Sequence, residues 1–436
     1  MITDNGQQRV TSPRQNQTIH RTLLDNGIVV LVAENPAADI VAARIFVRAG
    51  SCYEQQQQAG LTHLLSAVLT KGTQQLSSLE IAERVESVGA SLNADAGADY
   101  FLVSLKTVTS DFAEILELAG ELLRSPTFPE EEVELERRLT LQNIRSQQEQ
   151  PFTVAFDELR QAMYQNHPYA MSALGCSATM ANLSRADLDQ YHQTYFRPDN
   201  LVISIAGRVT VEDAVKRVEK VFGDWQRPTT PLPTLTLPAL TPQPYQTVTP
   251  QQTQQSIVML GYLASSVQKA DYIALKLLST YLGNGLSSRL FVELREKRGL
   301  AYDVSAFYPT RQHEAPFVVY IGTAPENTAI ALEGLRTEVE LLCTTQLSEE
   351  ALQVTKNKLL GQYALGKQTN AQIAQVFGWY EILGLGIEFD TQFQQEVADV
   401  SASVAQQVAC HYLLEPYMSI LGPEEVLNSL VAPATI

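Results

Sequence analysis

The chain contains the run Tyr195-Phe196-Arg197-Pro198-Asp199-Asn200-Leu201-Val202-Ile203-Ser204-Ile205-Ala206-Gly207 and, near its other end, the run Tyr412-Leu413-Leu414-Glu415-Pro416-Tyr417-Met418-Ser419-Ile420-Leu421-Gly422. In each run an aromatic residue and a proline turn lead into an apolar segment that ends at a glycine. A short apolar segment bounded by turn residues is typical of a buried β-strand. The recurrence of this pattern indicates that the two halves of the chain repeat one structural plan.

Segments outside these two runs follow the same order in both halves. β-rich runs come first, then a helical stretch, then a further strand and a long helical stretch. They lie at 28–32 with 40–47, 61–69, 100–106 and 111–123 in the first half, and at 256–262, 272–281, 317–322 and 328–342 in the second. Such clusters predict an α+β fold of two homologous domains, each a mostly antiparallel sheet with helices packed against it.

A proline-rich stretch separates the two halves. Seven prolines occur from Pro228 to Pro250, among Thr, Leu and Gln. Because proline removes a backbone donor and fixes φ, this composition favours an extended linker. We therefore expect an N-terminal domain at 17–226, a linker at 227–250 and a C-terminal domain at 251–431.

The charge composition limits the kinds of partner that the chain is expected to bind. The 436 residues include 31 Lys and Arg against 48 Asp and Glu, a formal net charge of −17. This charge argues against nucleic-acid binding, which depends on neutralising phosphates. It fits basic or unfolded polypeptide partners, and it fits an ordinary solvated acidic surface as well. The four cysteines are far apart and form no C-x-x-C pair, so we expect free thiols.

Targeting and membrane signals are lacking in the sequence. Met1 to Arg14 is polar and has no apolar core of the kind that a secretory signal needs. No apolar run reaches the about 18 residues of a membrane helix. We therefore expect a soluble protein, cytoplasmic or otherwise intracellular, with no transmembrane segment.

The histidines point to one segment of interest. The chain has six, and none lies within five residues of another, so no helical pair of metal-ligating histidines exists. His63, however, lies in Gly60-Leu61-Thr62-His63-Leu64-Leu65-Ser66-Ala67-Val68-Leu69-Thr70-Lys71-Gly72-Thr73. This segment resembles the zinc site of the pitrilysin, insulysin and mitochondrial-processing-peptidase superfamily, an inverzincin H-x-x-E-H motif followed by K-G-T.

The resemblance implies that the metal site has decayed. In the family both histidines bind zinc and the glutamate activates water, but here only His63 is kept, and Ser66 and Ala67 replace the other two. The family's third ligand is a glutamate on a later helix; it corresponds to Asn143, while Glu136 matches an acidic residue that supports the site. With three of four essential positions changed, we expect no metal or other cofactor on this chain.

Two other interpretations of this segment stay open. Ser66 and His63, three residues apart, could form a nucleophile and its base, although no third residue to orient the histidine is evident. The chain could also be an active enzyme with an unorthodox metal site.

A second segment carries a stronger resemblance. The stretch Leu282-Gly283-Asn284-Gly285-Leu286-Ser287-Ser288-Arg289-Leu290-Phe291-Val292-Glu293-Leu294-Arg295-Glu296-Lys297-Arg298-Gly299-Leu300-Ala301-Tyr302 is similar to the family pattern L-G-x-G-x-S-S-R-L-F-x-x-L-R-E-x-x-G-L-A-Y. The resemblance implies that Arg295 and Tyr302 bind the substrate carbonyl and stabilise its developing negative charge. Without the flanking motif, Arg295 would be interpreted as part of a solvated helix end and Tyr302 as a strand-edge aromatic.

Shorter matches extend the resemblance over nearly the whole chain; they are Asp25–Val30, Arg48–Glu54, His167–Tyr169 with Gly175, and Asp224-Trp225. In two-subunit bacterial relatives, one chain holds the zinc motif and the other keeps only the Arg/Tyr pair. The resemblance therefore implies a catalytically incomplete subunit of a zinc metalloendopeptidase. It would pair with a zinc-bearing homologue, or form a homodimer, and help to cleave peptides or unfolded polypeptides. The alternative is a structural or scaffold protein of the same fold.

Overall fold

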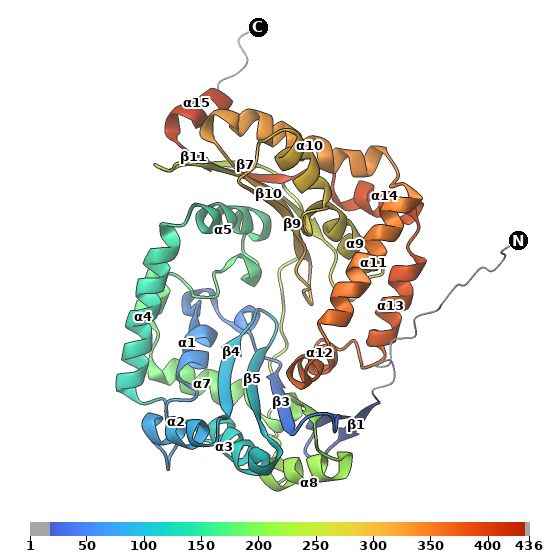
Figure 1. Cartoon of the computed structure of the whole chain (residues 1–436). Helices are drawn as coiled ribbons and strands as arrows, with labels where there is room; N and C mark the ends of the chain where they lie inside the picture. Colours follow the sequence, from blue (N-terminus) through green and yellow to red (C-terminus); the bar gives the residue numbers. More distant parts are fainter. Residues whose placement is uncertain (1–17, 432–436) are drawn as a thin grey trace, which may run out of the picture.

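The structure is a computed structural model that describes residues 18–431, and its strands form two sheets (Figure 1). The N-terminal sheet has the order β1-β2-β6-β3-β5-β4, and the C-terminal sheet has the order β7-β11-β8-β10-β9. The strands are β1 (Ile19–Leu23), β2 (Val29–Glu34), β3 (Ile40–Val47), β4 (Ser91–Ala96), β5 (Phe101–Val108), β6 (Leu201–Gly207), β7 (Gln246–Pro250), β8 (Ser256–Ala264), β9 (Asp303–Phe307), β10 (Ala315–Thr323) and β11 (Tyr417–Gly422).

The two sheets share one topology. The order β2-β6-β3-β5-β4 of the first sheet corresponds strand by strand to β7-β11-β8-β10-β9 of the second, and β1 is an addition. In both, the first pair is parallel, with Val29 opposite Val202 and Gln246 opposite Met418, while the remaining pairs are antiparallel. The apolar runs at 201–207 and 417–422 form the corresponding strands β6 and β11. The predicted α+β fold with an internal repeat is confirmed.

Helices cover the sheets on both faces. Those before the linker are α1 (Leu61–Val68), α2 (Ser78–Ser87), α3 (Phe112–Arg124), α4 (Glu130–Gln148), α5 (Pro151–Tyr164), α6 (Ser177–Asn182), α7 (Arg185–Tyr195) and α8 (Val211–Phe222). Those after it are α9 (Tyr272–Gly283), α10 (Thr328–Thr344), α11 (Glu349–Leu365), α12 (Asn370–Ile382), α13 (Phe389–Asp399), α14 (Ala402–Tyr412) and α15 (Glu424–Val431).

Each domain contributes one helix to the sheet of the other. α12 packs on β3 and β6 of the N-terminal sheet, and α5 packs on β8 and β11 of the C-terminal sheet (Figure 1). Glycines permit both close approaches: a Cβ on Gly378 of α12 would lie 2.3 Å from the Phe46 ring, and one on Gly261 of β8 would lie 2.7 Å from Met163. Since helices cover both faces, strands such as β6 are buried at every position and appear as continuous apolar runs.

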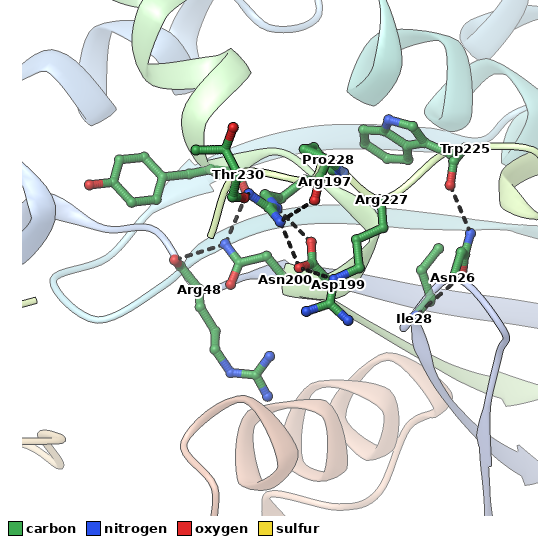
Figure 2. Close-up of polar contacts among 11 residues, drawn as sticks. Asn26, Ile28, Arg48, Arg197, Asp199, Asn200, Trp225, Arg227, Pro228 and Thr230 are labelled. Carbon is green, nitrogen blue, oxygen red and sulfur yellow. Dashed lines mark hydrogen bonds and ion pairs between the residues drawn. The ribbon is translucent and has the colours of Figure 1, made fainter. Parts of the chain in front are cut away.

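The proline-rich stretch is tied to the N-terminal domain before it joins the second sheet. Arg197 donates to the backbone carbonyls of Thr230 at 2.7 Å and Pro228 at 3.3 Å (Figure 2). Arg197 and Arg227 both pair with Asp199, at 2.6 and 2.9 Å. The stretch contains no helix or strand until its last five residues, which form β7. The C-terminal sheet thus begins inside the segment that we expected to be linker throughout.

Two expectations concern residues that the structure leaves undescribed. The polar stretch from Met1 to Arg14, and residue 17 at the predicted start of the N-terminal domain, lie outside the described residues. Across 18–431, none of the helices has the length and apolar character that crossing a bilayer requires.

Candidate functional site

A buried carboxylate holds the start of α1, the helix that resembles a zinc-site helix. Gly60 precedes α1 with a φ of 94°, a left-handed conformation that favours glycine. Glu54 accepts hydrogen bonds from the backbone N–H of Gly60 at 2.9 Å and from the N–H and hydroxyl of Thr62 at 2.7 and 2.5 Å. Burial raises the pKa of Glu54 to about 7, and these hydrogen bonds act in the opposite direction. The carboxylate thereby satisfies backbone donors that a helix start leaves unpaired.

His63 lies on α1 within the electrostatic influence of Glu136 on α4, and the two helices pack against each other. Burial lowers the pKa of His63, and the negative charge of Glu136 opposes this effect. Glu136 also pairs with Lys71, whose Nζ lies 3.2 Å from its Oε1. The structure therefore groups the remaining histidine with two residues that flank the family's metal site, and it favours a neutral imidazole.

The other positions of the motif do not complete a metal site. The Ser66 hydroxyl donates to the backbone carbonyl of His63 at 2.8 Å. The nucleophile–base interpretation needs a bond from this hydroxyl to the imidazole, which the structure does not show. Ala67 has no donor atom, and Asn143 is exposed, about 10 Å beyond Glu136 along α4.

Zinc in proteins takes three or four ligands from Cys, His, Asp and Glu. In the part of the chain that the structure describes, no three such side chains gather to hold a metal ion. The residues at the family's zinc position therefore do not fit the ion.

Arg295 lies on a π-helix, Phe291–Lys297, in the C-terminal domain. Leu294 is fully buried and anchors the turn, and its carbonyl accepts the N–H of Leu300 at 2.9 Å. The Arg295 side chain is exposed, and its guanidinium carbon lies 5.0 Å from the centroid of the Phe291 ring. Single π-helical turns are rare and frequently occur at functional sites.

The charged neighbours of Arg295 pair among themselves. Glu293 accepts Arg289 at 3.1 Å and Lys297 at 2.8 Å, and Arg289 also binds Glu338 at 2.6 Å. Among the ion pairs of residues 18–431, none includes Arg295. The charged neighbours of Arg295 therefore behave as a solvated helix end whose charges pair with one another. The guanidinium of Arg295 stays available to bind a ligand.

Tyr302 directly precedes the edge strand β9. Its backbone N–H donates to the carbonyl of Gly322 on β10 at 2.8 Å, which fixes the main chain. The side chain is nevertheless 61% exposed. Within the described residues, its ring contacts no other aromatic ring and its hydroxyl has no hydrogen-bond partner, so the side chain contributes little to packing at the strand edge.

The two segments belong to different domains. α1 packs against α4, α7 and β4, whereas the π-helix packs against β9 and α10. Figure 1 shows α1 beside β4 in one domain and β9 in the other. The His63 segment therefore does not pack against the segments that carry Arg295 and Tyr302.

Glu54 is a residue whose role the sequence did not reveal. Sequence comparison placed it only in a turn motif. It precedes Gly60 by six residues, whereas the recognisable capping-box signal has a spacing of three. Because the chain folds back between Glu54 and Gly60, the contact becomes visible only in three dimensions.

Comparisons with known proteins agree with this architecture. Residues 29–177 match the family model described as Insulinase (Peptidase family M16), and residues 182–359 match the model described as Peptidase M16 inactive domain. The chain belongs to peptidase family M16, and its two sheets are the two domains of that fold.

Relatives and solved structures span almost the same length. The chain is 27% identical over 362 residues to an uncharacterised zinc protease of Bacillus subtilis, covering 82% of this chain and 87% of that one. It is 27% identical to an uncharacterised zinc protease of Mycobacterium bovis, covering 94% of each.

The crystal structure titled as a peptidase M16 inactive domain, from Pseudomonas fluorescens, has a TM-score of 0.87 at 23% identity and covers 93% of this chain and 98% of that one. A protease from Helicobacter pylori also has a TM-score of 0.87, at 22% identity, with 94% and 100% covered. These structures share the fold, and the family and its named relatives make the chain a protein of peptidase fold.

Proposed function

We propose that this chain is the catalytically incomplete subunit of a zinc metalloendopeptidase and supplies Arg295 and Tyr302 to substrate bound at a zinc-bearing homologue. The proposal rests on a contrast between the Arg/Tyr pair and the chain's own zinc motif. Arg295 and Tyr302 project from a fixed backbone with no ion-pair or hydroxyl partner in the described residues. The chain's own motif, by contrast, has Ser66 and Ala67 where a glutamate and a histidine are needed.

The two side chains suit an amide carbonyl. A guanidinium offers planar donors and keeps its charge at every physiological pH, and a phenol offers one O–H donor. Both would donate to the carbonyl oxygen of the bond to be cleaved. These hydrogen bonds strengthen as the oxygen gains negative charge, so they stabilise the transition state more than the bound substrate.

The partner we propose is a homologue with an intact motif. A homodimer would contain the same Ser66, Ala67 and Asn143 twice and would have no complete metal site. That relatives at 27% identity are named zinc proteases supports a zinc-bearing partner of the same fold. The net charge of −17 supports substrates that are basic or unfolded peptides.

The test is peptide hydrolysis by the mixed subunits. The chain is co-purified with a zinc-bearing M16 homologue from the same genome, and cleavage of a fluorogenic peptide is followed. Arg295→Ala and Tyr302→Phe should each lower kcat by about 10²-fold to 10³-fold, the usual effect of removing one oxyanion donor. Arg298→Ala, on the same exposed segment, and Tyr245→Phe, at a tyrosine that is 50% exposed, should leave kcat unchanged.

Two outcomes would contradict the proposal. If the complex forms and cleaves the peptide equally well with Arg295→Ala and Tyr302→Phe, the chain has a scaffold role. If the isolated chain hydrolyses the peptide and contains stoichiometric zinc, it is an active enzyme with an unorthodox metal site.

A further inference from the structure

The C-terminal domain contains a cavity of about 690 Å³ between α9, β9 and the helices α11 to α13. Its volume lies in the range of small-molecule sites, which is roughly 300–1,000 Å³. Aromatic side chains dominate its lining: Tyr272, Phe307, Tyr308, Tyr363, Trp379, Tyr380, Phe389 and Phe393. Several of these rings contact one another, as in the stacked pair Tyr363 and Phe393, whose ring centroids are 4.5 Å apart. The cavity is therefore built from rigid, flat surfaces that belong to five different elements.

Among the described residues that line this cavity, Lys276 is the only charged one. Its Nζ donates to the backbone carbonyl of Tyr308 at 2.6 Å and lies 5.7 and 5.5 Å from the ring centroids of Tyr272 and Tyr308. Among the ion pairs of the described residues, none involves Lys276. An ammonium has three N–H donors, and the protein takes one of them.

This arrangement is costly without a ligand. A partly buried ammonium with no carboxylate partner loses hydration that nothing in the protein replaces in full. Desolvation accordingly lowers the pKa of Lys276 to about 8. The carbonyl of Tyr308 and the two rings hold the ammonium in place, and two donors stay available for a ligand.

We propose that this cavity binds a carboxylate joined to an aromatic body, with the carboxylate on Lys276 and the ring against the aromatic lining. A carboxylate carries the single negative charge that matches one lysine, whereas a phosphate dianion would leave a buried charge without a partner. The flat walls favour a ring, since offset and edge-to-face contacts between rings add to simple apolar burial. The inference does not depend on the proposed peptidase role.

Two sources share this chemistry: a free aromatic acid, and a peptide that ends in an aromatic residue. N-acetyl-phenylalanine represents the first, and Ala-Ala-Phe with a free C-terminus represents the second. The amides of both are matched controls, because each keeps the ring and removes the charge. Calorimetric titration of the full chain at about pH 7, where Lys276 is charged, should show at least one of the acids binding about tenfold or more tightly than its amide.

Variants of two lysines test the role of the cation. Lys276→Met keeps the length of the side chain and should lower the affinity of the acid to that of the amide. Lys269→Met, at an exposed lysine just before α9, should change neither affinity. Equal binding of acid and amide by the wild-type protein, or unchanged acid binding in Lys276→Met, would overturn the proposal.

Raising the pH provides a test that needs no lysine variant. As the pH rises through about 8, Lys276 loses its charge and acid binding should weaken, while amide binding stays constant. The phenols that face the cavity stay protonated in this window, because burial raises the pKa of Tyr272, Tyr308, Tyr363 and Tyr380. Of the other charged groups near the lining, Lys367 and Asp390 pair with each other at 2.6 Å, and Lys358 donates to the backbone carbonyl of Asn284. Desolvation also lowers the pKa of Lys358, so the pH series is repeated in a Lys358→Met variant, in which the loss of acid binding should persist. Constant acid affinity across the window would contradict a role for Lys276.

Fluorescence locates the ligand. The chain has two tryptophans, and of these only Trp379 lines the cavity. In a Trp225→Phe variant, N-acetyl-phenylalanine should change the emission of Trp379 with the same dissociation constant that calorimetry gives. Saturable calorimetric binding with no change in Trp379 emission would place the acid elsewhere and overturn the proposed site.

Discussion

The hydroxyl of Ser66 donates a hydrogen bond of 2.8 Å to the backbone carbonyl of His63, one turn earlier on α1. Ser66 is therefore bound to its own helix and not to the imidazole, and Ala67 beside it has no donor atom. A zinc site would need ligands at Ala67 and Asn143 beside His63, since zinc takes at least three protein ligands, and a glutamate at Ser66 would be needed only to activate the water.

We predict that zinc binding returns only when both missing ligand positions, Ala67 and Asn143, are restored, since a glutamate at Ser66 would activate water and add no ligand. Wild-type protein and the pair Ser66→Glu with Ala67→His should retain no stoichiometric zinc after dialysis, because His63 and one new histidine supply two ligands. Adding Asn143→Glu should give about one zinc per chain. Atomic absorption on the purified proteins measures this. Stoichiometric zinc in the double variant would show that a residue other than Asn143 takes the third position.

Glu54 should make stability depend on pH. Burial raises its pKa to about 7, above its ordinary value of 4.5. Between these values the folded protein holds a proton that the unfolded chain has released, so the free energy of unfolding falls as pH rises and levels off above about 7.

Relative to Glu54→Gln, the wild type should lose about 3 kcal/mol of stability across this window. Chemical unfolding at a series of pH values measures the difference, and Glu83→Gln, at an exposed carboxylate on α2, is the control. A constant difference between wild type and Glu54→Gln would show that the three hydrogen bonds keep the carboxylate ionised throughout.

Two arginines that share Asp199 should differ in their effect on stability (Figure 2). Arg197 is 4% exposed and also holds the carbonyls of Pro228 and Thr230, whereas the side chain of Arg227 is 68% exposed. Arg197→Met should lower the free energy of unfolding by about 3–5 kcal/mol, because it takes the buried partner from the carboxylate of Asp199, whose side chain is 10% exposed. Arg227→Met should cost less than about 1 kcal/mol. Urea unfolding of both variants checks this, and equal losses would mean that the linker carbonyls contribute nothing.

The contact of α12 with the N-terminal sheet can be tested at one glycine. A Cβ on Gly378 would lie 2.3 Å from the ring of Phe46 and 2.9 Å from Ser204, so Gly378→Ala should destabilise the protein by about 1–3 kcal/mol. Gly361→Ala on α11 is the matched control, since no atom of the described residues would lie within 4 Å of its Cβ. It should stabilise by up to about 1 kcal/mol, as alanine is the better helix former. Thermal unfolding measures both changes in stability. If both variants were stabilised, α12 would not be pressed against the sheet.

Much of the fold was predictable because its signals are local. The strands β6 and β11 follow from apolar runs after proline turns, and α1, α3, α9 and α10 begin and end within two residues of the predicted stretches. The exchange of α5 and α12 between the domains was not predictable, because an apolar helix face indicates burial without indicating which sheet covers it. β7 was missed since its five residues, which end at Pro250, have no strand pattern of their own.

In the candidate site, too, some features could be predicted from the sequence and others only from the structure. The residue types at 63, 66, 67 and 143, and the pair Arg295 and Tyr302, could be read from spacing and resemblance, and the functional role of that pair stays a prediction. Folding alone revealed that Glu54 caps α1 and that Lys276 faces an aromatic cavity. It also showed that no carboxylate of residues 18–431 pairs with Arg295. Sequence patterns record what neighbouring residues along the chain can do. Burial, charge pairing and cavities depend on which distant segments meet, and that is settled only when the whole chain packs.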